Sequence, residues 1–151
     1  DKAITPTRNE RVMGEDEIGK RLERMFREDR FAQLLGVEVE EVSEDVSRVT
    51  AVVREEHLNK HVTAHGGFVF TLADVAFALT VNARSDAVAV QWSLSQFRSA
   101  ALGERLTAEC RLLHGGRRLR VVELVVSNGD GRVLAKGQAT AIPVESVRPQ
   151  A

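Results

Sequence analysis

The sequence predicts an α+β fold, in which an antiparallel sheet wraps around one long central helix and a further helix precedes the sheet. The first observation is a run from Phe68 to Val81 that is apolar nearly all round, which is typical of a helix buried inside a core. The second is a set of segments that alternate apolar and polar residues between turn residues, as antiparallel strands do. The third is the last of these segments, residues 132–142, where small residues share one face and allow close approach.

Length and composition favour one globular domain. The chain has 151 residues, of which 43% are hydrophobic, and this is enough for a single core. We expect the domain to cover residues 16–143, between a flexible N-terminal arm at 1–15 and a flexible tail at 144–151. The formal net charge of −1 gives no reason to expect nucleic acid or an anionic membrane as a partner.

Membrane and redox signals are equally weak. The apolar run at 68–81 is shorter than the ~20 residues of a membrane-spanning helix. The single cysteine, Cys110, cannot form an internal disulfide, so a reducing, cytoplasmic setting fits. Cys110 alternates with apolar residues, which predicts an inert, buried strand position rather than a nucleophile.

The first helix is expected within residues 16–35, because apolar residues recur there at helical spacing and Gly36 follows as a stop. After Gly36 the apolar period changes to two, which predicts two strands between 37 and 53. A loop at 55–65 then leads to the central helix, which should end within 82–86. The apolar face of the first helix should pack across the domain and consists of Ile18, Leu22, Met25, Phe26, Phe31, Leu34 and Leu35.

Four further strands should follow the central helix. Gly115-Gly116 and the segment 128–131 are strong hairpin signals between them. The small face of the last strand is expected to let the central helix approach, and its members are Val133, Ala135, Gly137, Ala139 and Ala141. The expected strands are 87–97, 105–113, 118–127 and 132–142.

The start of the central helix combines two features that suit catalysis. Gly66 and Gly67 lack side chains, so their N–H groups at a helix N-terminus could bind a developing negative charge, as an oxyanion hole does. Asp74 interrupts the apolar run and is expected to be buried, where an ionised carboxylate is unfavourable unless partners compensate. Each feature has a structural alternative, because the glycines can be a plain turn and Asp74 can be a structural acid.

Three histidines, His57, His61 and His65, are spaced four residues apart and would align on one face of a helix as metal ligands. The segment has no apolar stripe and no HExxH arrangement, so we expect no metal site and no cofactor. His65 is instead expected to brace the glycine turn. A Gly-x-Ser-x-Gly motif is absent, which argues against a serine nucleophile.

Three motifs follow one another before and within the central helix: Leu-Asn-Lys-His at 58–61, His-Gly-Gly at 65–67 and Leu-Ala-Asp at 72–74. In this order they resemble the hotdog-fold acyl-CoA thioesterases of the phenylacetic-acid-degradation (PaaI-like) type. The resemblance extends over residues 31–143. It includes Gln-Phe-Arg at 96–98, after which the family usually has proline and this chain has serine.

The resemblance implies hydrolysis of an acyl-CoA or aryl-acyl-CoA thioester to the free acid and coenzyme A. It assigns the oxyanion hole to the backbone N–H of Gly66, and the role of general base or nucleophile to Asp74. Asn59 matches the family position that orients the carboxylate or the water, and its structural alternative is a plain turn asparagine. His65, next to the glycines, belongs to the same predicted catalytic set.

Substrate binding is predicted at four residues. Gly67 adjoins the predicted oxyanion hole, and Arg98 and Arg117 are candidates for the phosphates of coenzyme A. Phe70, on the central helix, is a candidate for the lining of an acyl or aryl pocket. Surface charge and core packing are the structural alternatives for these side chains.

The spacing of Gly66 and Asp74 predicts an assembly. They are eight residues apart, which is about 12 Å along a helix and too far for one thioester carbonyl and its attacking water. Two antiparallel copies around a two-fold axis can bring Gly66 of one chain beside Asp74 of the other. The resemblance implies the same homodimer, commonly paired into a homotetramer.

Two other functions are open at this point. Hotdog proteins include hydroxyacyl dehydratases, in which His65 and Asp74 would be the catalytic histidine and acid. The fold also serves as a non-catalytic acyl-CoA-binding module. The presence of Asp74 together with the glycine turn favours the thioesterase.

Overall fold

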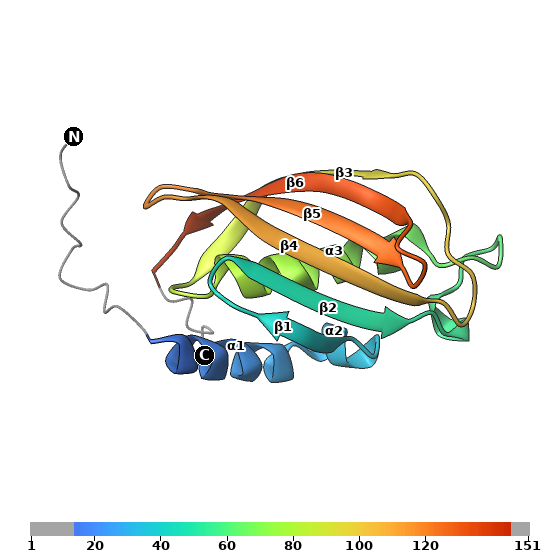
Figure 1. Cartoon of the computed structure of the whole chain (residues 1–151), viewed down its shortest axis with the longest axis horizontal. Coiled ribbons are helices and arrows are strands. Elements are labelled where there is room, and N and C mark those ends of the chain that lie inside the picture. The colour runs from blue at the N-terminus through green and yellow to red at the C-terminus, as the bar shows by residue number, and fades with distance from the viewer. Residues whose placement is uncertain (1–13, 146–151) are drawn as a thin grey trace.

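The computed structural model describes residues 14–145, in which a curved antiparallel sheet holds one long helix (Figure 1). The six strands lie in the order β1-β2-β4-β5-β6-β3, and every neighbouring pair is antiparallel. This confirms the predicted hotdog-type fold. The elements are α1 (Glu15–Glu28), α2 (Arg30–Leu34), β1 (Glu38–Val42), β2 (Val46–Val52), the 3₁₀ helix η1 (Glu55–His57), α3 (Gly66–Val81), β3 (Ala87–Gln96), β4 (Arg105–Gly115), β5 (Arg120–Asn128) and β6 (Val133–Pro143).

The predicted arm at 1–15 and tail at 144–151 lie mostly outside the described residues, and Glu15 already belongs to α1. The two predicted hairpins are observed, since β5 pairs with β4 through one turn and with β6 through the other. In residues 14–145 no helix is long and apolar enough to cross a membrane.

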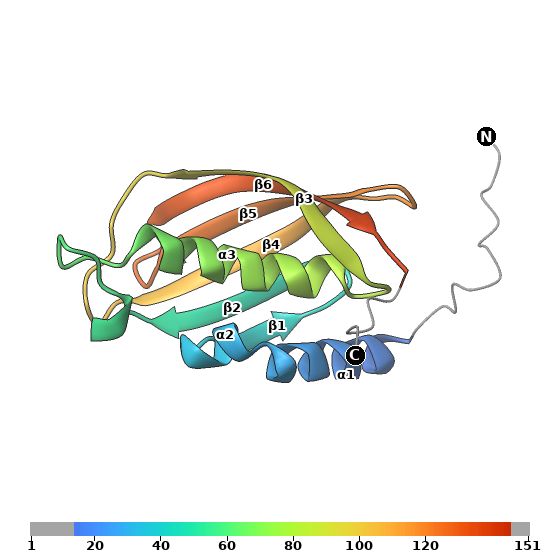
Figure 2. The same ribbon diagram turned by 180° about the vertical axis from the view of Figure 1, so that it is seen from behind.

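The core lies between α3 and the concave face of the sheet, where α3 packs mainly on β2, β4 and β5 (Figure 2). Its sequence is apolar nearly all round, and Leu72, Ala73 and Ala76 have no exposed surface. Burying a leucine side chain contributes about 1.5–3 kcal/mol, so this helix is held by packing on several sides. Cys110 is fully buried on β4, and burial raises the pKa of its thiol to about 12, as expected of an inert cysteine.

The N-terminal segment is two helices rather than the single helix that the spacing predicts. Asp29 separates them, and its carboxylate accepts a hydrogen bond from the N–H of Ala32 at 3.0 Å, which caps α2. Ile18 and Leu22 of α1 pack in the core. Not all of the other predicted members face the core. Because α2 is a separate helix, its residues point in other directions than the α1 spacing predicts, and Phe31 is 56% exposed and Leu34 is 71% exposed.

Gly137, one of the small residues of β6, admits the neighbouring strand β3, whereas Ala135, Ala139 and Ala141 of the same predicted face are fully buried in the core. A side chain on Gly137 would overlap the carbonyl oxygen of Ser93 and lie 2.8 Å from the Cα of Leu94, both on β3. The register of β5 and β6 also shifts between Val126 and Ser127, so the predicted alternation fails at the start of β6, where Leu134 is buried. Gly137 therefore lets β3 join the sheet as one of its two edge strands.

Candidate active site

The turn at the start of α3 leaves one backbone donor without a partner. Nδ1 of His65 accepts a hydrogen bond from the N–H of Gly67 at 2.8 Å, so His65 braces the turn as expected. The N–H of Phe68 donates to the carbonyl of His65 at 2.9 Å. Within residues 14–145 the N–H of Gly66 donates to no acceptor. A free donor at a helix N-terminus suits an oxyanion, because the helix dipole adds a partial positive charge.

His57 supports this turn through contacts with Phe68 and His65. The residue is 2% exposed and its ring is stacked on Phe68, with 4.0 Å between ring centroids and 12° between planes. Its carbonyl accepts the N–H of His65 at 2.7 Å, and its Nδ1 accepts the N–H of Arg54 at 2.9 Å. An Nδ1 that accepts a hydrogen bond carries no proton, and burial, followed by the charge of Arg54, lowers the pKa of the His57 imidazole.

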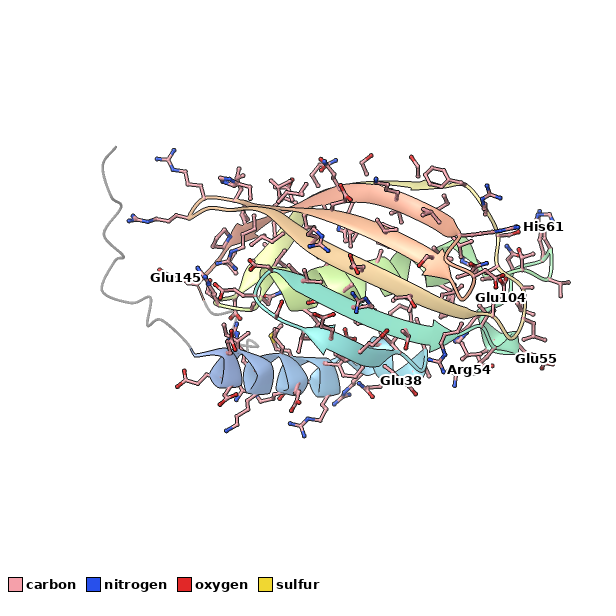
Figure 3. The ribbon with its side chains drawn as sticks, in the orientation of Figure 1. Glu38, Arg54, Glu55, His61, Glu104 and Glu145 are labelled. Carbon is pink, nitrogen blue, oxygen red and sulfur yellow. The ribbon has the colours of Figure 1, made fainter. Side chains whose placement is uncertain are left out.

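The histidine spacing does not produce a metal site in the described part of the chain. His57 and His65 use their Nδ1 atoms as hydrogen-bond acceptors, while His61 projects from the loop at the end of the molecule where α3 begins (Figure 3). Residues 14–145 contain no group of three or more potential ligand side chains close enough to hold a metal ion.

Asp74 is half-buried in the single chain and not fully buried as the apolar run suggested. Burial is the main reason that the pKa of its carboxyl is raised, and repulsion by Asp29 adds to this. In the described residues the Asp74 carboxylate accepts no hydrogen bond, so its oxygens are available to a water or to another donor. A carboxylate with a raised pKa is a stronger base than an ordinary aspartate.

Asn59 holds the loop that precedes the glycine turn. Its Oδ1 accepts hydrogen bonds from the N–H of His61 at 2.9 Å and of Thr63 at 3.2 Å. The loop also holds Val62 at a φ of 62°, an uncommon conformation for a β-branched residue. Within the single chain Asn59 therefore stabilises a turn, and its Nδ2 group donates to nothing within residues 14–145.

Aromatic side chains gather on the Asp74 face of α3. Phe70 and Phe77 lie four residues before and three residues after Asp74, which places all three on one helix face. Both phenylalanines contact Trp92 of β3, with ring centroids 4.6 Å and 4.9 Å apart. Phe70 and Trp92 are partly exposed, so this cluster forms an apolar wall beside the acid.

The two predicted arginines lie at opposite ends of α3. Arg98 lines an open hollow of about 510 Å³ near the start of α3, and the same hollow includes Arg132. Arg117 belongs to the turn between β4 and β5, where Arg120 bonds the carbonyl of Val81 at the other end of α3. Figure 3 shows Glu104, which also lines the hollow, at the same end of the molecule as His61. The single chain therefore does not bring Arg98 and Arg117 together.

Two side chains at this end were missed by sequence reasoning. Arg132 joins Arg98 only because the turn between β5 and β6 folds beside the end of β3. Gln96 donates from its Nε2 to the carbonyl oxygen of Gly66 at 3.2 Å. Gln96 stands within the motif at 96–98, but its contact joins residues 30 positions apart, and no local pattern indicates it.

Comparisons with known proteins agree on one family. The sequence model described as Thioesterase superfamily matches residues 61–135. The chain is 43% identical over 106 residues to a putative esterase from Deinococcus radiodurans, covering 70% of this chain and 73% of the relative. It is 32% identical over 112 residues to the acyl-coenzyme A thioesterase PaaI of Escherichia coli, covering 74% of this chain and 80% of PaaI.

Solved structures are similar over most of the chain. The E. coli PaaI protein from the phenylacetic acid degradation operon superposes with a TM-score of 0.82 at 28% identity, covering 85% of this chain and 94% of that one. A hypothetical thioesterase from Streptococcus pneumoniae, solved with coenzyme A, gives a TM-score of 0.75 at 29% identity, with coverages of 80% and 95%.

Proposed function

Because the chain belongs to the thioesterase superfamily as a PaaI-like hotdog acyl-CoA thioesterase, we propose that it hydrolyses an acyl-CoA or aryl-acyl-CoA thioester with Gly66 and Asp74. The observation that carries this assignment is the unpaired N–H of Gly66 at the start of a buried helix. The half-buried, unbonded carboxylate of Asp74 supplies the second group that the reaction needs.

The chemistry has two steps at the thioester. The carbonyl oxygen accepts the N–H of Gly66, and its negative charge grows as the tetrahedral intermediate forms. Asp74 removes a proton from the attacking water, or it attacks the carbonyl carbon itself to give an anhydride that water then cleaves. In either route the tetrahedral intermediate collapses, the C–S bond breaks and coenzyme A leaves as a thiolate. The thiolate takes up the proton that Asp74 removed from water or, in the anhydride route, the proton that is released when water cleaves the anhydride.

The other predicted residues support these two groups. His65 and Gly67 hold the turn through their 2.8 Å hydrogen bond, so their role is to fix the direction of the Gly66 donor. The free Nδ2 of Asn59 is suited to donate to the Asp74 carboxylate or to the water. Phe70, with its neighbours on α3 and β3, is suited to contact an apolar acyl or aryl group.

The site needs two chains in this proposal. Gly66 and Asp74 are about 12 Å apart along α3, and this distance is fixed because both residues belong to the same helix. β3 is an edge strand on which Val88 is 41% and Val90 is 54% exposed, and this face is suited to a second copy. A two-fold axis would then give a homodimer with two equivalent sites, and two dimers a homotetramer.

The same arrangement explains the positions of the arginines. Arg98 stands near the start of α3 and Arg117 near its end, so an antiparallel partner would bring Arg98 of one chain towards Arg117 of the other. Coenzyme A carries phosphates that guanidinium groups bind in a bidentate manner. Arg132, which shares the hollow with Arg98, is a further candidate for these phosphates.

A panel of acyl-CoA and aryl-acyl-CoA esters, with release of free thiol as the readout, tests the activity. We expect thiol release from at least one ester. Hydration of an enoyl-CoA without thiol release would assign a dehydratase instead, and binding of esters without turnover would assign a binding module.

Mixing two variants of strongly reduced activity tests the shared site. Asp74→Asn and Gly66→Ala subunits, combined under conditions that permit exchange, should form mixed dimers with one doubly defective site and one intact site. Random pairing makes half of the dimers mixed, so activity should recover to about a quarter of wild type. Native mass spectrometry would verify the exchange. Absence of recovery among verified mixed dimers would contradict a site shared between subunits.

A further inference from the structure

Gln96, the last residue of β3, lies against the turn that starts α3. Its Nε2 donates to the carbonyl oxygen of Gly66 at 3.2 Å. Both terminal atoms of its amide lie 3.4 Å from the position that a Cβ on Gly66 would take. The amide therefore rests on the backbone of the residue whose N–H is the proposed oxyanion donor.

The peptide between Gly66 and Gly67 is thus held from two sides. Its N–H donates to Nδ1 of His65 at 2.8 Å, and its carbonyl oxygen accepts from Gln96. Two successive glycines without Cβ atoms have wide backbone freedom, so an unsupported turn would sample several directions. A donor that contributes to catalysis must keep its direction before the substrate arrives, since an error of 1 Å in position can lower a rate by about 100-fold.

We propose that Gln96 is a positioning residue that fixes the Gly66–Gly67 turn against β3, so that the Gly66 N–H keeps the direction required for the oxyanion. This inference rests on the proposed thioesterase function. It also joins the donor to the strand that carries Trp92, so the aromatic wall and the oxyanion hole share one support.

Kinetics of Gln96→Ala and Gln96→Glu test the role, with Gln138→Ala and Gln138→Glu as matched controls. Gln138 is exposed on β6 and its side chain makes no hydrogen bond within residues 14–145. We expect Gln96→Ala to lower kcat by about 10-fold with little change in KM, because a misdirected donor affects the transition state more than binding. Values of kcat within two-fold of Gln138→Ala would overturn the proposal.

The pH profile of Gln96→Glu adds a readout that a purely structural residue would not move. The carboxyl group that this substitution introduces can still donate to Gly66 while it is protonated, whereas its ionised form repels that carbonyl and a nearby oxyanion. The activity ratio of Gln96→Glu to Gln138→Glu should therefore fall as pH rises through the glutamic acid pKa, which is about 4.3 when unperturbed. A ratio that is constant with pH would contradict the proposed contact.

Amide hydrogen exchange on the whole, substrate-free protein tests the positioning without any assay of activity. Exchange of the Gly67 N–H should quicken several-fold in Gln96→Ala and stay unchanged in Gln138→Ala. Unchanged exchange at Gly67 would overturn the positioning role even if the enzyme hydrolyses thioesters. Faster exchange in a protein whose wild type releases no thiol would instead retain the contact and reject the proposed function.

Discussion

The two ends of α3 differ in how their backbone groups are satisfied. At the C-terminal end, Arg21 donates to the carbonyl of Asn82 at 2.9 Å, and Arg120 donates to the carbonyls of Val81 and Ser85. At the N-terminal end, the N–H of Gly66 has no acceptor within the described residues. Charge follows the same division, because two arginines cap the negative end of the helix dipole and no acid occupies its first turn.

This difference separates a structural end from a functional one. Satisfying the last carbonyls of a helix stabilises it, and arginine at that end adds a favourable interaction with the dipole. An unsatisfied donor gives no such stabilisation, but its partial positive charge is available to a ligand. Substitutions of the two residues that cap the first end, Arg21 and Arg120, should therefore change stability alone, and those at the second end should change turnover.

The largest effect is expected at Asp74. Asp74→Asn keeps the shape of the side chain and removes the base or nucleophile, so kcat should fall by at least ~100-fold. Steady-state thiol release would measure this. Asp45→Asn, which changes an exposed acid between β1 and β2, is the control. Near-normal turnover by folded Asp74→Asn would exclude the catalytic role.

The same substitution, Asp74→Asn, should not lower the stability of the fold although it lowers turnover. Since its folded pKa is raised, Asp74 favours folding below its unfolded pKa of 3.8, and this contribution is lost as pH rises through the folded value. Asp74→Asn should therefore be at least as stable as wild type at neutral pH, as determined by urea unfolding.

Gly66→Ala should have the next largest effect on turnover. An added methyl group would meet the Gln96 amide at 3.4 Å, an ordinary contact, and Gly66 does not have a positive φ. The fold should tolerate it, while the methyl group obstructs the approach of the thioester and lowers kcat/KM by about 10- to 100-fold. Kinetics together with thermal unfolding would separate the two effects. Normal kcat/KM in this variant would show that another donor forms the oxyanion hole.

Arg120→Ala sharpens the comparison from the structural end. Loss of the guanidinium leaves carbonyls at the end of α3 without their charged donor, so the free energy of unfolding should fall by about 1–3 kcal/mol. The kcat should stay within two-fold of wild type. Arg24→Ala, an exposed arginine of α1, serves as the control for charge removal. A kcat lowered in proportion to stability would mean that the two ends are not independent.

The smallest effect concerns His57, which supports the functional end. The pKa of His57 is lower in the folded state than in the unfolded state, so as pH falls the unfolded state takes up a proton before the folded state does. The free energy of unfolding should therefore fall as pH drops below the unfolded pKa of about 6.5. The slope for one proton cannot exceed about 1.4 kcal/mol per pH unit. In His57→Gln, whose amide can accept from Arg54 without titrating, this slope should disappear in urea unfolding between pH 7.5 and 5.5. An unchanged slope would assign the pH dependence to another group.

Local sequence patterns predicted the elements better than the contacts between them. The apolar run and its flanking residues predicted α3 closely, and turn residues predicted both hairpins. The break at Asp29 was missed because the apolar spacing continues across it while the capping bond decides the structure. The contacts of Gln96 and Gly137 were missed because strand register sets them over long sequence separations. The assignment of Gly66 and Asp74 to one shared site stays a prediction, since it depends on a second chain.

The close approach at Gly137 has a consequence for screening by mutagenesis. Any side chain there must displace the β3 backbone, and β3 carries both Gln96 and Trp92. A saturation library scored for thioester turnover would thus rank Gly137 among the least replaceable positions, although it has no reactive group. A library scored only for expression would give it a different rank if the sheet survives without its edge, and comparing the two scores would distinguish residues that build the site from residues that act in it.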